Sequence, residues 1–162
     1  MKVQLYSLMA LLIIGCNPNH NSETITKVDF AVSGAMFSQG EAISIDSALN
    51  YKYLGLLGKK EQGCYQGKIS RQTWDSLTQK LKQINFDTIS ENGNKHILDV
   101  EYAELIIHWN NKEKRIVRAW DGKSPLLGVF NWIATTTKYA NLTEVKGPIN
   151  FETTFQNSPS ER

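Results

Sequence analysis

Residues 100–120 read VEYAELIIHWNNKEKRIVRAW, in which apolar and polar residues alternate on both sides of a short polar segment. Alternate side chains of a β-strand point to opposite faces of a sheet, so 100–109 and 114–120 predict two strands. Residues 110–112 predict the turn that joins them into an antiparallel hairpin. Both faces of the hairpin carry apolar residues, so we expect it to lie centrally in a sheet beneath helices.

The register of this hairpin depends on the length of its turn. With a three-residue turn, Glu113 lies opposite Trp109, and Glu104 lies opposite Arg118 as an opposite-charge pair. A shift by one residue would place charged side chains opposite apolar ones. The other pairs expected are Ile106 with Ile116, Tyr102 with Trp120, Leu105 with Val117, and Ala103 with Ala119.

Further strands are predicted before the hairpin. Residues 28–33 alternate apolar and polar side chains and predict one strand. Residues 42–46 and 50–53 alternate in the same way and predict a first hairpin. A short strand over residues 64–68 follows it. The pairs expected on one face of the first hairpin are Ile45 with Tyr51 and Ile43 with Tyr53.

Two helices are predicted by apolar residues at helical spacing. Ser70 is a suitable N-cap for the first helix, and Ser124-Pro125 is a typical start for the second. The first helix should end near residue 84, with Phe86 tucked beneath its end. The apolar stripes are Trp74, Leu77, Leu81 and Ile84 in the first helix, and Leu126, Phe130, Ile133 and Thr137 in the second.

The order of strands, helix, hairpin and helix predicts an α+β domain over residues 28–145. We expect an antiparallel sheet of five or six strands with both helices packed on it. A domain of this length can bury a sizeable core. Residues 146–162 form a polar tail, in which the alternation over 149–155 is compatible with an edge strand.

The N-terminus has the proportions of a secretory signal peptide. Lys2 precedes a mostly apolar run over residues 3–14, which is shorter than the ~20 residues that cross a bilayer. The run ends in Ile13-Ile14-Gly15-Cys16, which resembles the lipobox of bacterial lipoproteins. We therefore expect residues 1–15 to be removed and Cys16 to carry the lipid.

A lipid on Cys16 would tether the domain to a membrane. In that lipoprotein class the Cys thiol takes up diacylglycerol and the freed amine is acylated, and an anchor of several fatty-acid chains is effectively permanent. Residues 16–27 are polar and predict a flexible tether. Residues 17–21 lack the acidic run that resembles a surface-export signal, so we expect the outer membrane, facing the periplasm.

Several motifs carry a family resemblance. They are Ile43-Ser-Ile45, Tyr51-Lys-Tyr53-Leu-Gly55, Tyr65-Gln-Gly67-Lys68-Ile69-Ser70 leading to Trp74, Leu77 and Leu81, then Asn85-Phe86, Trp109, Trp120-Asp121 and Pro125. Through these motifs, residues 28–142 resemble a domain-of-unknown-function family of small secreted bacterial lipoproteins. The resemblance implies a fold type and an envelope location, and no activity. The chain lacks that family's cysteine pair over residues 35–41, and it has Ala48-Leu49 where the family often has Asp-Gly.

Charge argues against a nucleic-acid partner. Lys and Arg total 18 and Asp and Glu total 16, which leaves a net charge of +2. The charges of both signs are interspersed, whereas a nucleic-acid-binding domain typically carries a basic stripe.

The candidate catalytic and metal-binding residues are few. With Cys16 lipidated, Cys64 is the remaining thiol, and it has no disulfide partner. His96 and His108 are not at the spacing of metal ligands, so we expect no metal and no cofactor. Asp99, Glu101 and Glu104 offer carboxylates, which we expect to be solvated at a strand end. The full candidate set is Cys64, His96, His108, Asp99, Glu101 and Glu104.

Two functions from different classes remain. The first is a non-catalytic module that binds an envelope protein or glycan through exposed aromatic residues or the Lys59-Lys60 loop. The alternative is a small envelope hydrolase that uses His96 or His108 with nearby carboxylates. We expect the first, because no sequence pattern pairs a nucleophile with a base.

Overall fold

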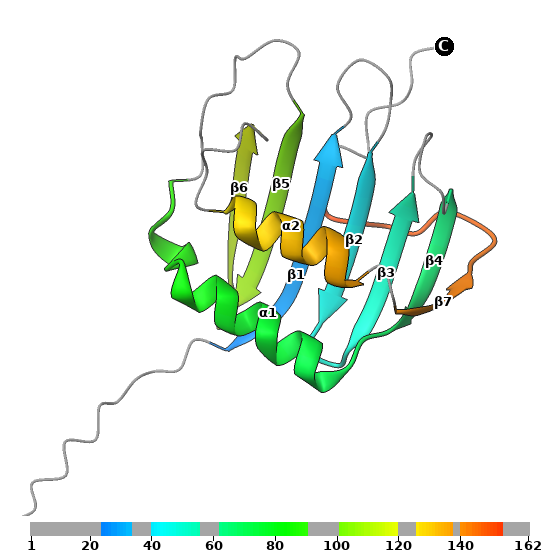
Figure 1. Cartoon of the computed structure of the whole chain (residues 1–162), viewed down its shortest axis with the longest axis horizontal. Helices are drawn as coiled ribbons and strands as arrows, with labels where there is room; N and C mark the ends of the chain where they lie inside the picture. The colour runs from blue at the N-terminus through cyan, green and yellow to red at the C-terminus, as the bar shows by residue number, and fades with distance from the viewer. Residues whose placement is uncertain are drawn as a thin grey trace, which may run out of the picture.

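The computed structural model describes residues 24–33, 40–55, 62–90, 101–119, 126–137 and 140–153. These residues form an α+β domain in which two helices cover one face of an antiparallel sheet (Figure 1). The sheet has seven strands in the order β6-β5-β1-β2-β3-β4-β7. The element bounds are β1 Ile25–Ser33, β2 Glu41–Asp46, β3 Asn50–Gly55, β4 Gly63–Lys68, α1 Arg71–Gln83, η1 Phe86–Thr88, β5 Tyr102–Trp109, β6 Lys112–Ala119, α2 Leu127–Thr136 and β7 Asn141–Glu144.

The α+β class and the order of strands, helix, hairpin and helix are as predicted. The number of strands is not, because five or six were expected. The seventh, β7, adds to β4 at the sheet edge, with Leu142 opposite Gly67. A Cβ on Gly67 would lie 2.2 Å from the Asn141 carbonyl oxygen, so the absence of a side chain at residue 67 permits this close pairing.

Strand β1 lies between β2 and β5 and is covered on both faces. Val28 and Phe30 face the helices, whereas Asp29 and Ala31 face the opposite side, here called the back face. All four are at most 1% exposed. The strand begins at Ile25, so residues 25–27, predicted as the end of the tether, belong to the sheet.

The first hairpin has the predicted register, with Ile43 opposite Tyr53 and Ile45 opposite Tyr51. In the second hairpin the predicted register is wrong by one residue. Trp109 lies opposite Lys112, because the turn has two residues, Asn110 and Asn111, with φ of 46° and 62°. Such left-handed residue pairs are typical of tight hairpin turns, and asparagine tolerates them better than most residues.

The shift changes the residue pairs across β5 and β6. Leu105 lies opposite Ile116, Ile106 opposite Arg115, and Glu104 opposite Val117 instead of Arg118. Strand β6 is also at the sheet edge, and only β5 lies centrally, contrary to the expectation for the hairpin as a whole.

The helices follow the predicted stripes. The Ser70 side chain caps α1 by accepting a hydrogen bond from the Thr73 backbone N–H, and Trp74, Leu77 and Leu81 are buried. In α2, Phe130 and Ile133 are buried, and the N-cap is Leu126. The predicted start at Ser124-Pro125 lies outside the described residues. Neither helix combines the length and hydrophobicity needed to span a membrane.

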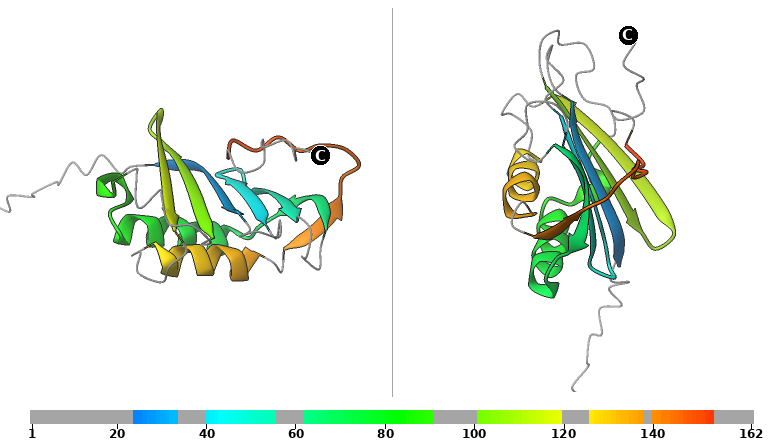
Figure 2. Two further views of the ribbon diagram at one scale, coloured as in Figure 1. Left: turned by 90° about the horizontal axis from the view of Figure 1, so that it is seen from above. Right: turned by 90° about the vertical axis from the view of Figure 1, so that its right-hand side faces the viewer.

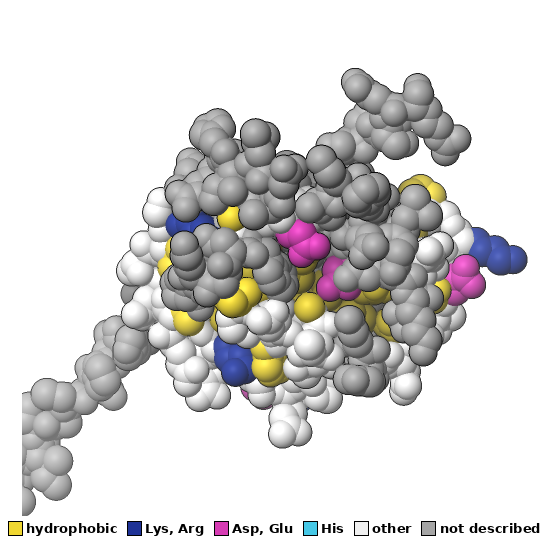
Figure 3. Space-filling view, turned by 45° about the horizontal axis from the view of Figure 1, so that its top comes forward, with side chains coloured by type: hydrophobic (Ala, Val, Ile, Leu, Met, Phe, Trp, Pro, Cys, Tyr) yellow, Lys and Arg dark blue, Asp and Glu magenta, His cyan; other side chains and the backbone are white. Residues whose placement is uncertain are grey.

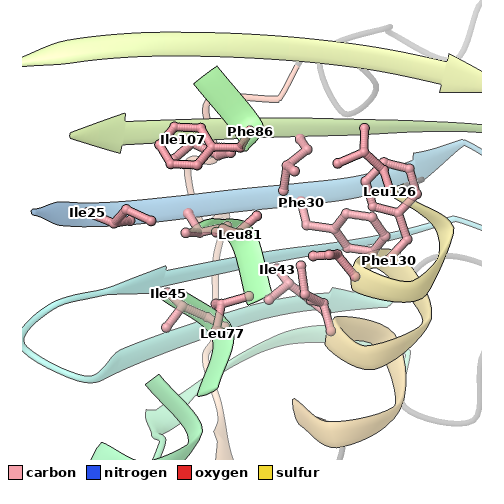
Figure 4. Close-up of a cluster of buried hydrophobic side chains, with 14 of the residues drawn as sticks. Ile25, Phe30, Ile43, Ile45, Leu77, Leu81, Phe86, Ile107, Leu126 and Phe130 are labelled. Atoms are coloured by element: carbon pink, nitrogen blue, oxygen red, sulfur yellow. The ribbon is translucent and has the colours of Figure 1, made fainter. Parts of the chain in front are cut away.

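The main core lies between the helices and the sheet (Figure 4). The rings of Phe30 and Phe130 are 5.3 Å apart between centroids, which joins β1 to α2. Phe86 packs edge-on against Trp109 at 4.9 Å, beneath the end of α1 as predicted. Aromatic pairs in these geometries add to the free energy of apolar burial.

Residues 145–153 follow β7 and cross the back face of the sheet (Figure 2). We call this segment the strap. The described part of the predicted edge strand, residues 149–153, lies in the strap and joins no strand. Phe151 is 8% exposed and packs with Ala31 and Ala42, which forms a second, small apolar cluster.

Candidate functional site

Charged side chains gather where the strap meets the centre of the sheet. Lys27 and Asp29 come from β1, His108 from β5 and Glu152 from the strap. The Lys27 ammonium lies 2.6 Å from Glu152 Oε1 and 2.8 Å from Asp29 Oδ2. His108 Nε2 lies 2.6 Å from Glu152 Oε2. We call these four residues the back-face cluster.

The register of the sheet brings the cluster together. Lys27 is directly opposite His108 in the β1–β5 pairing, and Asp29 is two positions further along the same face. Glu152 reaches them because Phe151 is held against Ala31 and Ala42. The cluster is thus built from three segments that are far apart in the sequence.

Burial within the back-face cluster is uneven. The Asp29 side chain is fully buried, and its carboxylate contacts the Lys27 ammonium without a well-aligned hydrogen bond. The Lys27, His108 and Glu152 side chains are 28%, 24% and 45% exposed. One side of the cluster is therefore closed by protein, and the other is open to solvent.

The ion pairs shift two pKa values in the cluster. Burial is the largest single influence on the Glu152 carboxyl and favours its neutral form, but the nearby Lys27 and His108 together outweigh it and lower its pKa. Burial likewise favours neutral Lys27, yet the carboxylates of Asp29 and Glu152 outweigh it and raise its pKa. Both residues are thus held in their charged forms.

A second ion pair lies beside the cluster. Arg115 on β6 contacts the fully buried Glu104 carboxylate through Nη1, and its Nη2 donates to the Glu152 carbonyl oxygen at 3.3 Å. The expectation of a solvated Glu104 is therefore wrong. Its predicted partner Arg118 instead donates to the Ser90 carbonyl oxygen at 2.7 Å. The one-residue change in hairpin register brings Arg115 rather than Arg118 to the Glu104 side of the sheet.

The helix side of the domain has a different feature, a polar cleft of about 290 Å³. It lies between the start of α1 and the end of α2. Five lining residues, Ser70, Thr73, Thr136, Thr137 and Asn141, carry hydroxyl or amide groups, and the others are Lys68, Ile69 and Ala140. Lys68 is the single ionisable residue among them, and its ammonium already donates to Ala48 O and Asn50 Oδ1.

The structure separates two of the predicted site residues. His108 is on β5 and Cys64 is on β4, and strands β1, β2 and β3 lie between them. His108 and Cys64 therefore lie too far apart to act together as a catalytic base and nucleophile. Cys64 is half-buried and free, and Glu101 is exposed.

Other predicted residues lie outside the described part of the chain. They are Cys16, Lys59, Lys60, His96 and Asp99.

Sequence reasoning missed Lys27, which it assigned to the tether, and also missed Asp29 and Glu152. Asp29 occupies a polar position in an alternating strand, a pattern that normally indicates exposure. Only the identification of β1 as a central strand could have indicated that this carboxylate is buried. Glu152 has no signal in its surrounding sequence, because its role depends on where the strap crosses the sheet.

The surface charge agrees with the composition. On the face shown in Figure 3, the Lys and Arg side chains of the described residues are scattered and do not form a basic patch.

Comparison with known proteins identifies the domain. Residues 40–144 match the model of the family described as "Domain of unknown function (DUF6438)", and the chain belongs to this family. The match covers most of the residues 28–142 on which the family resemblance was based. No curated protein and no solved structure matches the chain. Strand β1 and the strap lie outside the matched residues.

Proposed function

We propose that this member of the DUF6438 family is an envelope lipoprotein, anchored through Cys16, whose domain is a non-catalytic module that binds a polar ligand such as a glycan. The anchor is supported by the lipobox-like Ile13-Ile14-Gly15-Cys16 after a short apolar run. The binding function is supported by the polar cleft.

The composition of the cleft lining carries the binding proposal. Besides the internal bonds of Ser70 with Thr73 and of Thr137 with the Ile133 carbonyl oxygen, its hydroxyl and amide groups can donate and accept further hydrogen bonds, which is the chemistry that a polyhydroxylated ligand requires. Its described lining contains no carboxylate, imidazole or thiol, so those residues supply no general base and no activated nucleophile. The volume of about 290 Å³ is at the lower end of small-ligand sites, which suits a short glycan rather than an extended polymer.

The cleft proposal can be tested by site-specific crosslinking in living cells. A photoreactive residue in place of the exposed Thr136 should give an adduct, whereas one in place of Lys112, at the tip of the β5–β6 hairpin, should not. Digestion of the adduct with a glycan-cleaving enzyme then distinguishes glycan from protein. Adding Thr73→Val should reduce the Thr136 adduct several-fold by removing a hydroxyl from the lining. Equal crosslinking from both positions would contradict the proposal.

The anchor is tested separately. Cys16→Ala should leave an unprocessed precursor that no longer incorporates a fatty-acid probe, because the thiol is the group that accepts the lipid. A Cys64→Ser variant is the matched control and should be labelled normally. Persistent labelling of Cys16→Ala would refute the anchor. Protease treatment of intact cells should leave the domain uncut if it faces the periplasm.

A second candidate is a small envelope hydrolase that uses His108. One observation favours it: the Glu152 carboxylate contacts the His108 ring, as a carboxylate does when it orients a catalytic base. The two candidates predict different loss-of-function variants. In complementation of a deletion strain, a hydrolase would be inactivated by His108→Gln, and a cleft-binding module by Thr73→Val with Thr136→Val.

A further inference from the structure

We propose that Asp29, His108 and Glu152 form a site for a divalent transition metal, which fastens the strap to the sheet. One possible ligand atom from each residue lies within 4.8 Å of the others. The site is on the back face, opposite the helix-side cleft, so this inference goes beyond the proposed binding function.

The donor set indicates the class of metal. Two carboxylates and one imidazole suit Zn²⁺ and its neighbours, whereas Mg²⁺ and Ca²⁺ prefer an all-oxygen shell. Zinc–ligand bonds of about 2.0–2.2 Å place the ligand atoms of a tetrahedral site about 3.4 Å apart. The widest ligand separation must therefore close by roughly 1.4 Å at most, whereas His108 Nε2 and Glu152 Oε2, now 2.6 Å apart, must open by roughly 0.8 Å. Glu152 and His108 are partly exposed and have room for that movement.

Asp29 supplies an independent reason to expect a bound cation. Its carboxylate is fully buried, and neither oxygen has a well-aligned hydrogen bond. A buried carboxylate without such bonds is costly, so it is normally paired with positive charge or bound to a metal. In the described part of the chain, the cation given at this carboxylate is the Lys27 ammonium, which lies 2.8 Å from Oδ2. Asp29 therefore has remaining capacity to bind a metal.

Lys27 now provides the positive charge of the site. Its ammonium lies between Asp29 and Glu152 and neutralises one of their two negative charges. A divalent ion would neutralise both. The Lys27 side chain is 28% exposed, so its ammonium can turn outward to solvent when the ion enters. Metal and ammonium thus compete, and removing the ammonium should tighten metal binding.

The position of Glu152 determines what a bound metal would do to the strap. Asp29 and His108 belong to the sheet, and Glu152 belongs to the strap. A metal bound to all three would therefore hold residues 149–153 on the back face. Three protein ligands leave a fourth position for water on the exposed side of Glu152.

The test is calorimetric titration of Zn²⁺ into the lipidated protein, purified from membranes in detergent. All variants carry Cys64→Ser, so that this thiol does not bind the ion. We expect one Zn²⁺ per chain. His108→Gln and Glu152→Gln should each weaken binding at least about tenfold, and Lys27→Met should strengthen it about tenfold. Glu144→Gln, an exposed carboxylate on β7, is the matched control and should change nothing.

A second measurement reports the strap itself. Amide hydrogen exchange of residues 149–153 should slow on addition of Zn²⁺, and His108→Gln should abolish this effect. Circular dichroism verifies that each variant is folded. The proposal is overturned if Lys27→Met protein binds no Zn²⁺, or if His108→Gln and Glu152→Gln bind it as tightly as the parent. Tight binding without slower exchange in the strap would also overturn it.

Discussion

The two faces of the sheet are covered in different ways. On the helix side, α1 and α2 bury a continuous apolar layer that includes Phe30, Ile43 and Leu105. On the back face, the strap buries only a small apolar cluster around Phe151, and beside it lie ion pairs with buried carboxylates. One face is stabilised mainly by apolar area, and the other depends on the placement of individual charges.

The two faces should contribute differently to the free energy of folding. Apolar burial is non-directional and grows with area, so the helix side should provide most of the folding free energy. A buried ion pair contributes little net stability, but removing one partner is costly. The back face should therefore add less to stability and be more sensitive to single charge changes and to pH.

The largest expected loss of stability comes from a substitution on the helix side. Trp74 on α1 is 4% exposed, and Trp74→Ala should lower the free energy of unfolding by about 3–5 kcal/mol, because it removes apolar contacts and leaves a cavity. Urea denaturation followed by circular dichroism measures this. The exposed Gln72→Ala on the same helix is the control. A loss below about 1 kcal/mol would mean that this side of α1 does not hold the core.

A smaller loss of stability is expected when the ion pair between Arg115 and Glu104 is broken. Arg115→Met should destabilise the domain by about 1–3 kcal/mol, because the buried Glu104 carboxylate loses a charged hydrogen-bond donor. Adding Glu104→Gln should recover part of that loss, since the negative charge is then absent. Lys112→Met, at the exposed start of β6, is the control. If the double variant is less stable than Arg115→Met alone, the charge of Glu104 is not the cause.

The smallest effect should be a pH dependence of how firmly the strap is held against the sheet. The pKa of Glu152 is lowered from its ordinary value of 4.5, so its stabilising contacts are complete above that pH and are lost as pH falls through the lower folded-state value. The pKa of Lys27 is raised above 10.5, so its contribution is complete below 10.5 and is lost as pH rises through the higher folded-state value. The strap should therefore be held most firmly between these limits.

Limited proteolysis of the strap between pH 7 and pH 3 tests this dependence, with a protease that is active throughout. Cleavage within residues 145–153 should increase before the core unfolds. In Glu152→Gln the strap should already be cut more readily at neutral pH, and the acid-dependent increase should be reduced. An unchanged pH profile in that variant would assign the response to another group.

Much of the helix side was predictable from the sequence. The stripe of Trp74, Leu77 and Leu81 and the cap at Ser70 are local patterns, and the structure confirms them. The first hairpin register was also correct. The second was not, because Asn110 and Asn111 can form either a complete two-residue turn or part of a longer one, and residue pairing alone did not distinguish these.

The back face was not predictable in the same way. The sequence by itself determined the apolar periodicities, the helix cap and the α+β order, because these depend on residues within about one helical turn or one strand of each other. Only the tertiary structure decided that Asp29 is buried, that β7 extends the sheet, and that Glu152 reaches Lys27 and His108. Those contacts join residues up to 125 positions apart. They form because neighbouring strands and the strap bring side chains from distant parts of the sequence within a few ångströms of one another, which no local pattern specifies.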